Sequence, residues 1–185
     1  MLFFISGGSA SGKSALSERI CCALPGEHIY IATMPVRGAE DERKVARHHA
    51  LRAGRGFAAT LEMPGRLGAV PPDAAVLFEC LSTFTANRMF SGETSADWLE
   101  TLWAEMRPLI ARPGPTVIVS ADVGEDGSEF DPLTEDYRRV LTGLGCRLCA
   151  EADAAVEAVC GRAVWHKGAP PEGLPFEKGA VSEAD

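Results

Sequence analysis

Basic residues are too few in this chain to form a binding face for a polyanion. The 185 residues include 18 Lys and Arg against 26 Asp and Glu, which gives a formal net charge of −8. A nucleic-acid groove or an anionic membrane surface would need a basic face. The sequence also lacks an apolar run near the roughly 20 residues of a membrane span. We therefore expect a cytoplasmic protein that binds small molecules, with no nucleic acid and no membrane span.

A disulfide framework is missing as well. The spacing of the six cysteines is not typical of a secreted disulfide scaffold, and cytoplasmic thiols usually stay reduced. Cys146 and Cys149 form a CxxC pair, but a zinc site needs further ligands. Only Cys160 and His166 lie downstream to supply them. We therefore expect the cysteines to be small buried hydrophobes.

Short β-rich runs alternate with helical patterns, which is typical of βαβ units in a parallel sheet. The expected strands cover residues 2–6, 28–32, 74–79, 116–120, 154–160 and 162–166. Asp131 and Pro132 mark the start of the clearest helix, as N-cap and first residue. The sequence predicts an α/β fold, a single P-loop NTPase-like domain over residues 1–167 with a mainly parallel sheet flanked by helices. Residues 168–185, rich in Pro, Gly and acids, are expected to form a flexible tail.

A complete phosphate-binding loop lies between the first apolar run and the first helical pattern. It consists of Gly7, Gly8, Ser9, Ala10, Ser11, Gly12, Lys13 and Ser14. The glycines let backbone N–H groups surround phosphate oxygens, Lys13 reaches the β and γ phosphates, and the Ser14 hydroxyl ligates Mg²⁺. The N-terminus of the following helix adds the positive end of its dipole. The chain is therefore expected to use a nucleoside triphosphate.

Acidic residues end two of the expected strands. Glu79 directly follows an apolar run, where a carboxylate is poorly placed unless it lines a site. Such a strand-end acid can hold Mg²⁺ or orient a nucleophile, so we assign Glu79 to catalysis and, with Ser14, to the metal. Asp122 lies at the corresponding end of the next strand, in the region where open α/β sheets bind ligands. An exposed acid without a role accounts for Asp122 equally well.

Two adjacent histidines lie in the charge-rich segment 40–55. His48 and His49 are followed by Arg52 and Arg55, whose side chains suit phosphate contacts. A neutral histidine ring nitrogen can attack phosphorus and later release it. A solvated helix without chemistry is the alternative interpretation of this segment.

Taken in order, these motifs resemble the bifunctional adenosylcobinamide kinase / adenosylcobinamide-phosphate guanylyltransferases of cobalamin biosynthesis. A phosphate loop alone fits many kinase families, whereas these blocks in this order point to one family. The resemblance rests on residues 7–14, Tyr-Ile-Ala-Thr-Met at 30–34, the charged segment 40–52, Leu-Phe-Glu-Cys-Leu-Ser-Thr at 77–83 with Asn87, and Val123 with Gly124.

The resemblance implies two reactions that use ATP or GTP. The first phosphorylates adenosylcobinamide, and in the second a histidine takes GMP from GTP and passes it to adenosylcobinamide phosphate. Counting from Thr33 places that role on His48, with His49 as the alternative because the spacing to Glu62 is longer here than in the family. The resemblance also implies a homo-oligomer, a trimer. The implied site comprises Lys13, His48 and Glu79 as catalytic residues, Ser14 and Glu79 as Mg²⁺ ligands, and Gly7 to Ser14, Ala32, Thr33, Met34, His49, Ala50, Leu51, Arg52, Glu62 and Glu79 as nucleotide contacts.

The second half of the chain departs from the family pattern. Ala121, Arg139, Gly145 and Cys146 stand where the family has other, mostly polar, residues. These differences leave open whether both activities are retained. The alternatives are a different or single-activity small-molecule P-loop kinase and a non-catalytic nucleotide-binding paralogue. A GTPase-like switch is disfavoured, because the sequence has no Asn/Thr-Lys-x-Asp guanine motif.

Overall fold

The computed structural model describes residues 1–35, 54, 56–123 and 130–174. The helices are α1 (Lys13–Ala23), α3 (Leu81–Met89), α4 (Trp98–Ile110) and α5 (Pro132–Glu151). The strands are β1 (Leu2–Ser6), β2 (His28–Ala32), β3 (Ala59–Glu62), β4 (Ala75–Glu79), β5 (Thr116–Val119), β6 (Ala154–Val159) and β7 (Arg162–Lys167).

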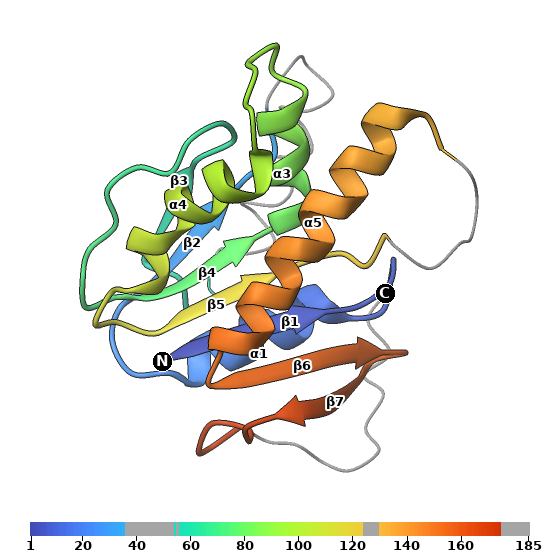
Figure 1. Cartoon of the computed structure of the whole chain (residues 1–185). Coiled ribbons are helices and arrows are strands. Elements are labelled where there is room, and N and C mark those ends of the chain that lie inside the picture. Colours follow the sequence, from blue (N-terminus) through green and yellow to red (C-terminus); the bar gives the residue numbers. More distant parts are fainter. Residues whose placement is uncertain (36–53, 55, 124–129, 175–185) are drawn as a thin grey trace.

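The strands form one seven-stranded sheet in the order β3-β2-β4-β5-β1-β6-β7. All neighbouring strands are parallel except the β6–β7 hairpin, which is antiparallel. Because parallel strands end at the same edge, the segments that follow β1, β2, β4 and β5 lie together at the carboxyl edge of the sheet (Figure 1). The predicted α/β fold with a mainly parallel sheet is confirmed.

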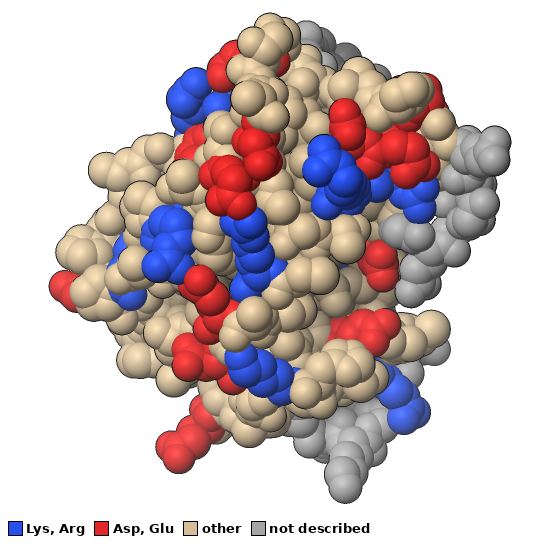
Figure 2. All heavy atoms as spheres, viewed as in Figure 1, with Lys and Arg blue, Asp and Glu red and all other residues tan. Residues whose placement is uncertain are grey.

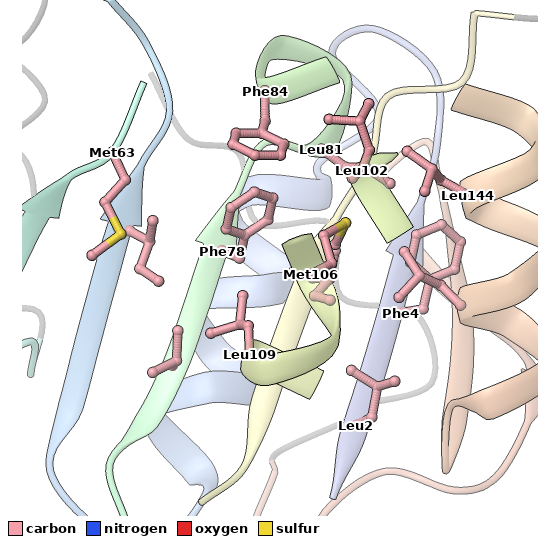
Figure 3. Close-up of a cluster of buried hydrophobic side chains, with 14 of the residues drawn as sticks. Leu2, Phe4, Met63, Phe78, Leu81, Phe84, Leu102, Met106, Leu109 and Leu144 are labelled. Carbon is pink, nitrogen blue, oxygen red and sulfur yellow. The ribbon is translucent and has the colours of Figure 1, made fainter. Parts of the chain in front are cut away.

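Helices cover both faces of the sheet, and the alternation of side chains along β1 shows why. Leu2 and Phe4 point into the core shared with α3, α4 and α5, whereas Phe3 and Ile5 point into the core under α1. Figure 1 shows α1 behind the sheet and the other helices in front. In the front core, drawn in Figure 3, the rings of Phe78 and Phe84 meet edge to face with centroids 5.6 Å apart.

Helix α5 begins where the sequence predicts. The Asp131 carboxylate accepts hydrogen bonds from the backbone N–H groups of Leu133 at 3.0 Å and Thr134 at 3.2 Å, and Pro132 is the first helical residue. Hydrogen bonds from Thr134 hold the pKa of Asp131 below its usual value. One side of the helix is buried against the sheet.

In the described part of the chain no helix is long and apolar enough to cross a membrane.

The expectation that the cysteines are buried is wrong for several of them. Cys21, on α1, is buried, and burial raises the pKa of its thiol to about 12. Cys146 and Cys149 are exposed on α5, and Cys160 is exposed at the turn between β6 and β7. Helical spacing places Cys146 and Cys149 beside, rather than on, the apolar stripe that faces the sheet.

Two elements were not expected from the sequence. Strand β3 is a short edge strand of four residues with only partial burial, so it has no apolar run to mark it. Helix α3 begins directly after β4, and its N-cap Cys80 makes no side-chain capping bond.

The end of the chain was expected to be a flexible tail. Leu174 packs partly against the core under α1, and residues 175–185 lie outside the described part of the chain.

Charged side chains on the face that carries α3, α4 and α5 are mixed in sign. Figure 2 shows Lys and Arg interspersed with Asp and Glu over the described part of this face, rather than gathered into a basic area. Arg107 pairs with Glu151 at 2.6 Å, and Arg88 pairs with Glu105 at 3.2 Å. This face therefore offers little attraction to a polyanion.

The two-sided core predicts a clear contrast between positions on α5. Leu144 is fully buried in the front core, whereas Leu133 on the same helix is 55% exposed. We expect Leu144→Ala to lower the free energy of unfolding by about 2–5 kcal/mol, because it leaves a cavity. Leu133→Ala should change it by less than about 0.5 kcal/mol. Urea denaturation of both variants measures the difference, and equal losses would contradict the assignment of the helix faces.

Candidate functional site

The phosphate loop leaves the carboxyl end of β1 and enters α1. Ala10 and Gly12 have positive φ values of 55° and 90°, which turn the backbone sharply in front of the helix. The Ser11 backbone N–H donates to the Gly8 carbonyl at 3.3 Å. The Lys13 ammonium donates to the same carbonyl at 2.8 Å, so its side chain folds back over the loop. This arrangement is suited to a phosphate group, because the lysine and the helix N-terminus face the same space.

Neighbouring segments hold the loop in place from both sides. On one side, the backbone N–H of Asp122 after β5 donates to the Gly7 carbonyl at 3.0 Å. On the other, the N–H of Gly161 in the β6–β7 turn donates to the Ser11 carbonyl at 2.9 Å. The contact at Gly7 is so close that a Cβ there would lie 2.6 Å from the Ala158 carbonyl oxygen. The loop is therefore fixed by its packing as well as by its own sequence.

A carboxylate at the end of β4 lies next to the loop. The Ser14 hydroxyl donates to Glu79 Oε1 at 2.6 Å, and the Tyr30 hydroxyl donates to Glu79 Oε2. Tyr30 is buried, and its ring meets Phe57 edge to face at 5.6 Å. A hydroxyl and a carboxylate oxygen are the kind of ligands that Mg²⁺ prefers. Ser14 and Glu79 therefore fit the metal role expected of them.

Hydrogen bonds hold the end of β2 against the end of β4. The Thr33 backbone N–H donates to the Glu79 carbonyl at 3.1 Å, and the Cys80 N–H donates to the Thr33 hydroxyl at 2.7 Å. The Asn87 amide on α3 donates to the Thr33 carbonyl at 2.7 Å and to the Pro64 carbonyl at 2.8 Å. Thr33 is buried, so its visible role is to hold these strand ends together.

The structure brings together the described members of the expected site. Ala32 is in register with Glu62 on one side and with Glu79 on the other, and Glu79 is in register with Val119. Met34 follows two residues later at the same edge. His48, His49, Ala50, Leu51 and Arg52 lie outside the described residues, so their places in the site stay predictions.

Sequence reasoning missed the roles of Tyr30 and Asn87. Both belong to segments that carry the family resemblance, but neither was assigned a contact. A tyrosine within an otherwise apolar strand was the available signal, because a buried hydroxyl usually needs a hydrogen-bond partner. For Asn87 the signal was weaker, because α3 itself was not expected.

Comparison with known proteins identifies the family. Residues 3–165 match the CobU family, cobinamide kinase / cobinamide phosphate guanyltransferase. The chain belongs to this family. The resemblance found in the sequence is therefore confirmed, and with it the function of a bifunctional kinase and guanylyltransferase that uses nucleoside triphosphates.

Curated relatives agree with this family. The chain is 27% identical to the bifunctional adenosylcobalamin biosynthesis protein CobU of Salmonella typhimurium, over 87% of this chain and 97% of that protein. It is 31% identical to the bifunctional adenosylcobalamin biosynthesis protein CobP of Pseudomonas aeruginosa, over 76% of this chain and 81% of that protein.

A solved structure of an ATPase from a bacterial type III secretion system aligns with a TM-score of 0.46 at 15% identity, over 89% of this chain and 56% of that one. That likeness is too weak to carry an argument.

The packing of the loop predicts different outcomes at two neighbouring glycines. Gly7→Ala should lower the free energy of unfolding by about 1–3 kcal/mol, because the new methyl group would overlap the Ala158 carbonyl. At Gly8 nothing lies within 4 Å of an added Cβ, so Gly8→Ala should cost less than about 0.5 kcal/mol. Thermal denaturation without nucleotide measures both variants. A Gly8 variant as unstable as the Gly7 variant would contradict this account of the loop.

Proposed function

We propose that both reactions of the family take place at the carboxyl edge of the sheet, above one phosphate loop. The observation that carries this proposal is the 2.6 Å contact between Ser14 and Glu79. It joins the last residue of the loop to the acid that ends β4, and so supplies the hydroxyl and carboxylate pair that a magnesium–nucleotide site needs.

In the kinase reaction, the loop residues 7–14 bind the phosphates of ATP or GTP. Lys13 turns from the Gly8 carbonyl to the β and γ phosphates. Ser14 and Glu79 would hold Mg²⁺, which when bound neutralises charge on the transferring group. The γ-phosphoryl group passes to the hydroxyl of the aminopropanol arm of adenosylcobinamide: its bond to the nucleoside diphosphate breaks, a bond to the acceptor oxygen forms, and the hydroxyl proton leaves.

In the guanylyltransferase reaction, a ring nitrogen of His48 attacks the α-phosphorus of GTP. The bond from this phosphorus to the bridging oxygen breaks and pyrophosphate leaves. A phosphate oxygen of adenosylcobinamide phosphate then attacks the same phosphorus, which releases the histidine and yields adenosylcobinamide-GDP. His49 is the alternative nucleophile. The family resemblance supports this step, and it likewise supports a homotrimer and a cytoplasmic location.

A chain with only one activity is the second candidate, and the departures from the family pattern favour it. Most of these departures lie on α5, away from the loop contacts described above. The Arg139 side chain is 68% exposed and pairs with Asp136, Cys146 is exposed, and a Cβ on Gly145 would touch Phe4 at 3.7 Å. Ala121 is the exception, because it directly precedes Asp122 beside the loop. The GTP-binding half of the family pattern is therefore better preserved than the second half.

Labelling with GTP tests the histidine step directly. Protein incubated with Mg²⁺ and GTP labelled on the α-phosphate should acquire an acid-labile, alkali-stable label, as a phosphoramidate does. We expect His48→Ala to abolish the label and His49→Ala to retain it. Loss only in the His49 variant would move the role to that residue.

A kinase assay on the same variants separates the two activities. His48→Ala should still phosphorylate adenosylcobinamide, because the histidine takes no part in that reaction, whereas Lys13→Ala should lose about 100-fold or more in rate. A wild-type protein that phosphorylates the acceptor but takes no label would support the single-activity candidate. Absence of both activities would indicate a non-catalytic paralogue.

A further inference from the structure

An apolar surface is exposed where the end of α3 meets the first turns of α5. It consists of Phe90, Phe130, Leu133 and Tyr137, and we call it the α3–α5 surface. Phe90 is 47% exposed and Leu133 is 55% exposed. Phe130 is also exposed, so this surface holds three of the six large hydrophobic side chains that are exposed in the described part of the chain.

A ring contact and helical spacing relate Phe90, Tyr137 and Leu133 to one another, and Phe130 lies just before the start of α5. The rings of Phe90 and Tyr137 are 5.9 Å apart between centroids. Leu133 lies one helical turn before Tyr137 on α5, so both side chains share a face. The Arg138 guanidinium lies 4.8 Å from the centroid of the Phe130 ring. Large exposed apolar patches mark interaction sites or ligand-binding grooves.

The α3–α5 surface is connected to the nucleotide site through α3. The Tyr137 hydroxyl donates to the Ser82 carbonyl at 3.2 Å, and the Ser82 hydroxyl lies 2.7 Å from the Cys80 sulfur. Cys80 directly follows Glu79. Figure 1 shows the first turns of α3 rising from the end of β4, with α5 passing beside them. The surface therefore borders the helix that leaves the carboxyl edge of the sheet, where we place phosphate transfer.

The acceptor has the chemistry that such a surface fits. A corrin is a broad macrocycle with largely apolar faces and amides at its rim, and it is too large for a domain of this size to enclose. We propose that the α3–α5 surface binds the corrin macrocycle of the acceptor. The proposal rests on the function proposed above. Phe90 and Leu133 contact the face of the macrocycle, while its aminopropanol arm extends toward Glu79 and the phosphate loop.

Two truncations test the proposal, with one matched control. Phe90→Ala and Leu133→Ala should each raise the KM for adenosylcobinamide about tenfold, because they remove apolar contact. Neither should change the KM for ATP or GTP. Val164 on β7 is also exposed, and Val164→Ala should leave both KM values unchanged. The α-labelled GTP experiment is run alongside, because labelling of the protein needs no acceptor.

The possible outcomes distinguish failure of this proposal from failure of the proposed function. Normal labelling with a raised acceptor KM supports the surface as the corrin site. Normal labelling with an unchanged acceptor KM overturns it, while the guanylyl step stands. Variants that sediment as smaller species with an unchanged acceptor KM would show a subunit interface instead.

A wild-type protein with neither label nor kinase activity would contradict the proposed function. Equilibrium dialysis with adenosylcobinamide then tests the surface alone. We expect the wild type and Val164→Ala to bind the corrinoid, and Phe90→Ala to bind it about tenfold more weakly. Equal binding by all three proteins would overturn the proposal.

Discussion

Two hydroxyl groups converge on one carboxylate at the carboxyl edge of the sheet, and the rest of the site depends on this contact. Ser14 and Tyr30 donate to the two oxygens of Glu79, which joins the phosphate loop, β2 and β4. Thr33 holds the ends of β2 and β4 together, and the turn at Gly161 holds the phosphate loop. Because each partner comes from a different element, the site exists only in the folded sheet. Under the proposed function, this short loop motif serves both the kinase and the guanylyltransferase reaction.

Much of this arrangement could be predicted from the sequence, because local chemistry dictates it. The glycines and Lys13 of the loop, placed between a strand and a helix, indicate phosphate binding by their spacing alone. Asp131 and Pro132 mark the start of α5 because a capping side chain and a preformed φ favour it there. Glu79 was recognisable as a carboxylate at the end of an apolar run. Each of these signals lies within a few residues of the feature that it predicts.

Features that depend on distant contacts were not predictable in the same way. The four residues of β3 become a strand by pairing with β2, and Thr83, Thr85 and Asn87 are weak helix formers that packing keeps in α3. The hydrogen bond from Tyr30 to Glu79 joins the neighbouring strands β2 and β4, and the two residues are 49 positions apart in the sequence. The α3–α5 surface likewise arises only when two separate helices meet. Such features follow from the order of the strands, which local patterns do not determine.

A double-mutant cycle between Ser14 and Glu79 tests the central claim most directly. Isothermal titration calorimetry of GTP binding with Mg²⁺ would compare wild type, Ser14→Ala, Glu79→Gln and the double variant. If the two residues act as one magnesium–nucleotide site, their effects are coupled by about 1 kcal/mol or more. Effects that add within about 0.5 kcal/mol would contradict the account, because the two groups would then serve the nucleotide independently.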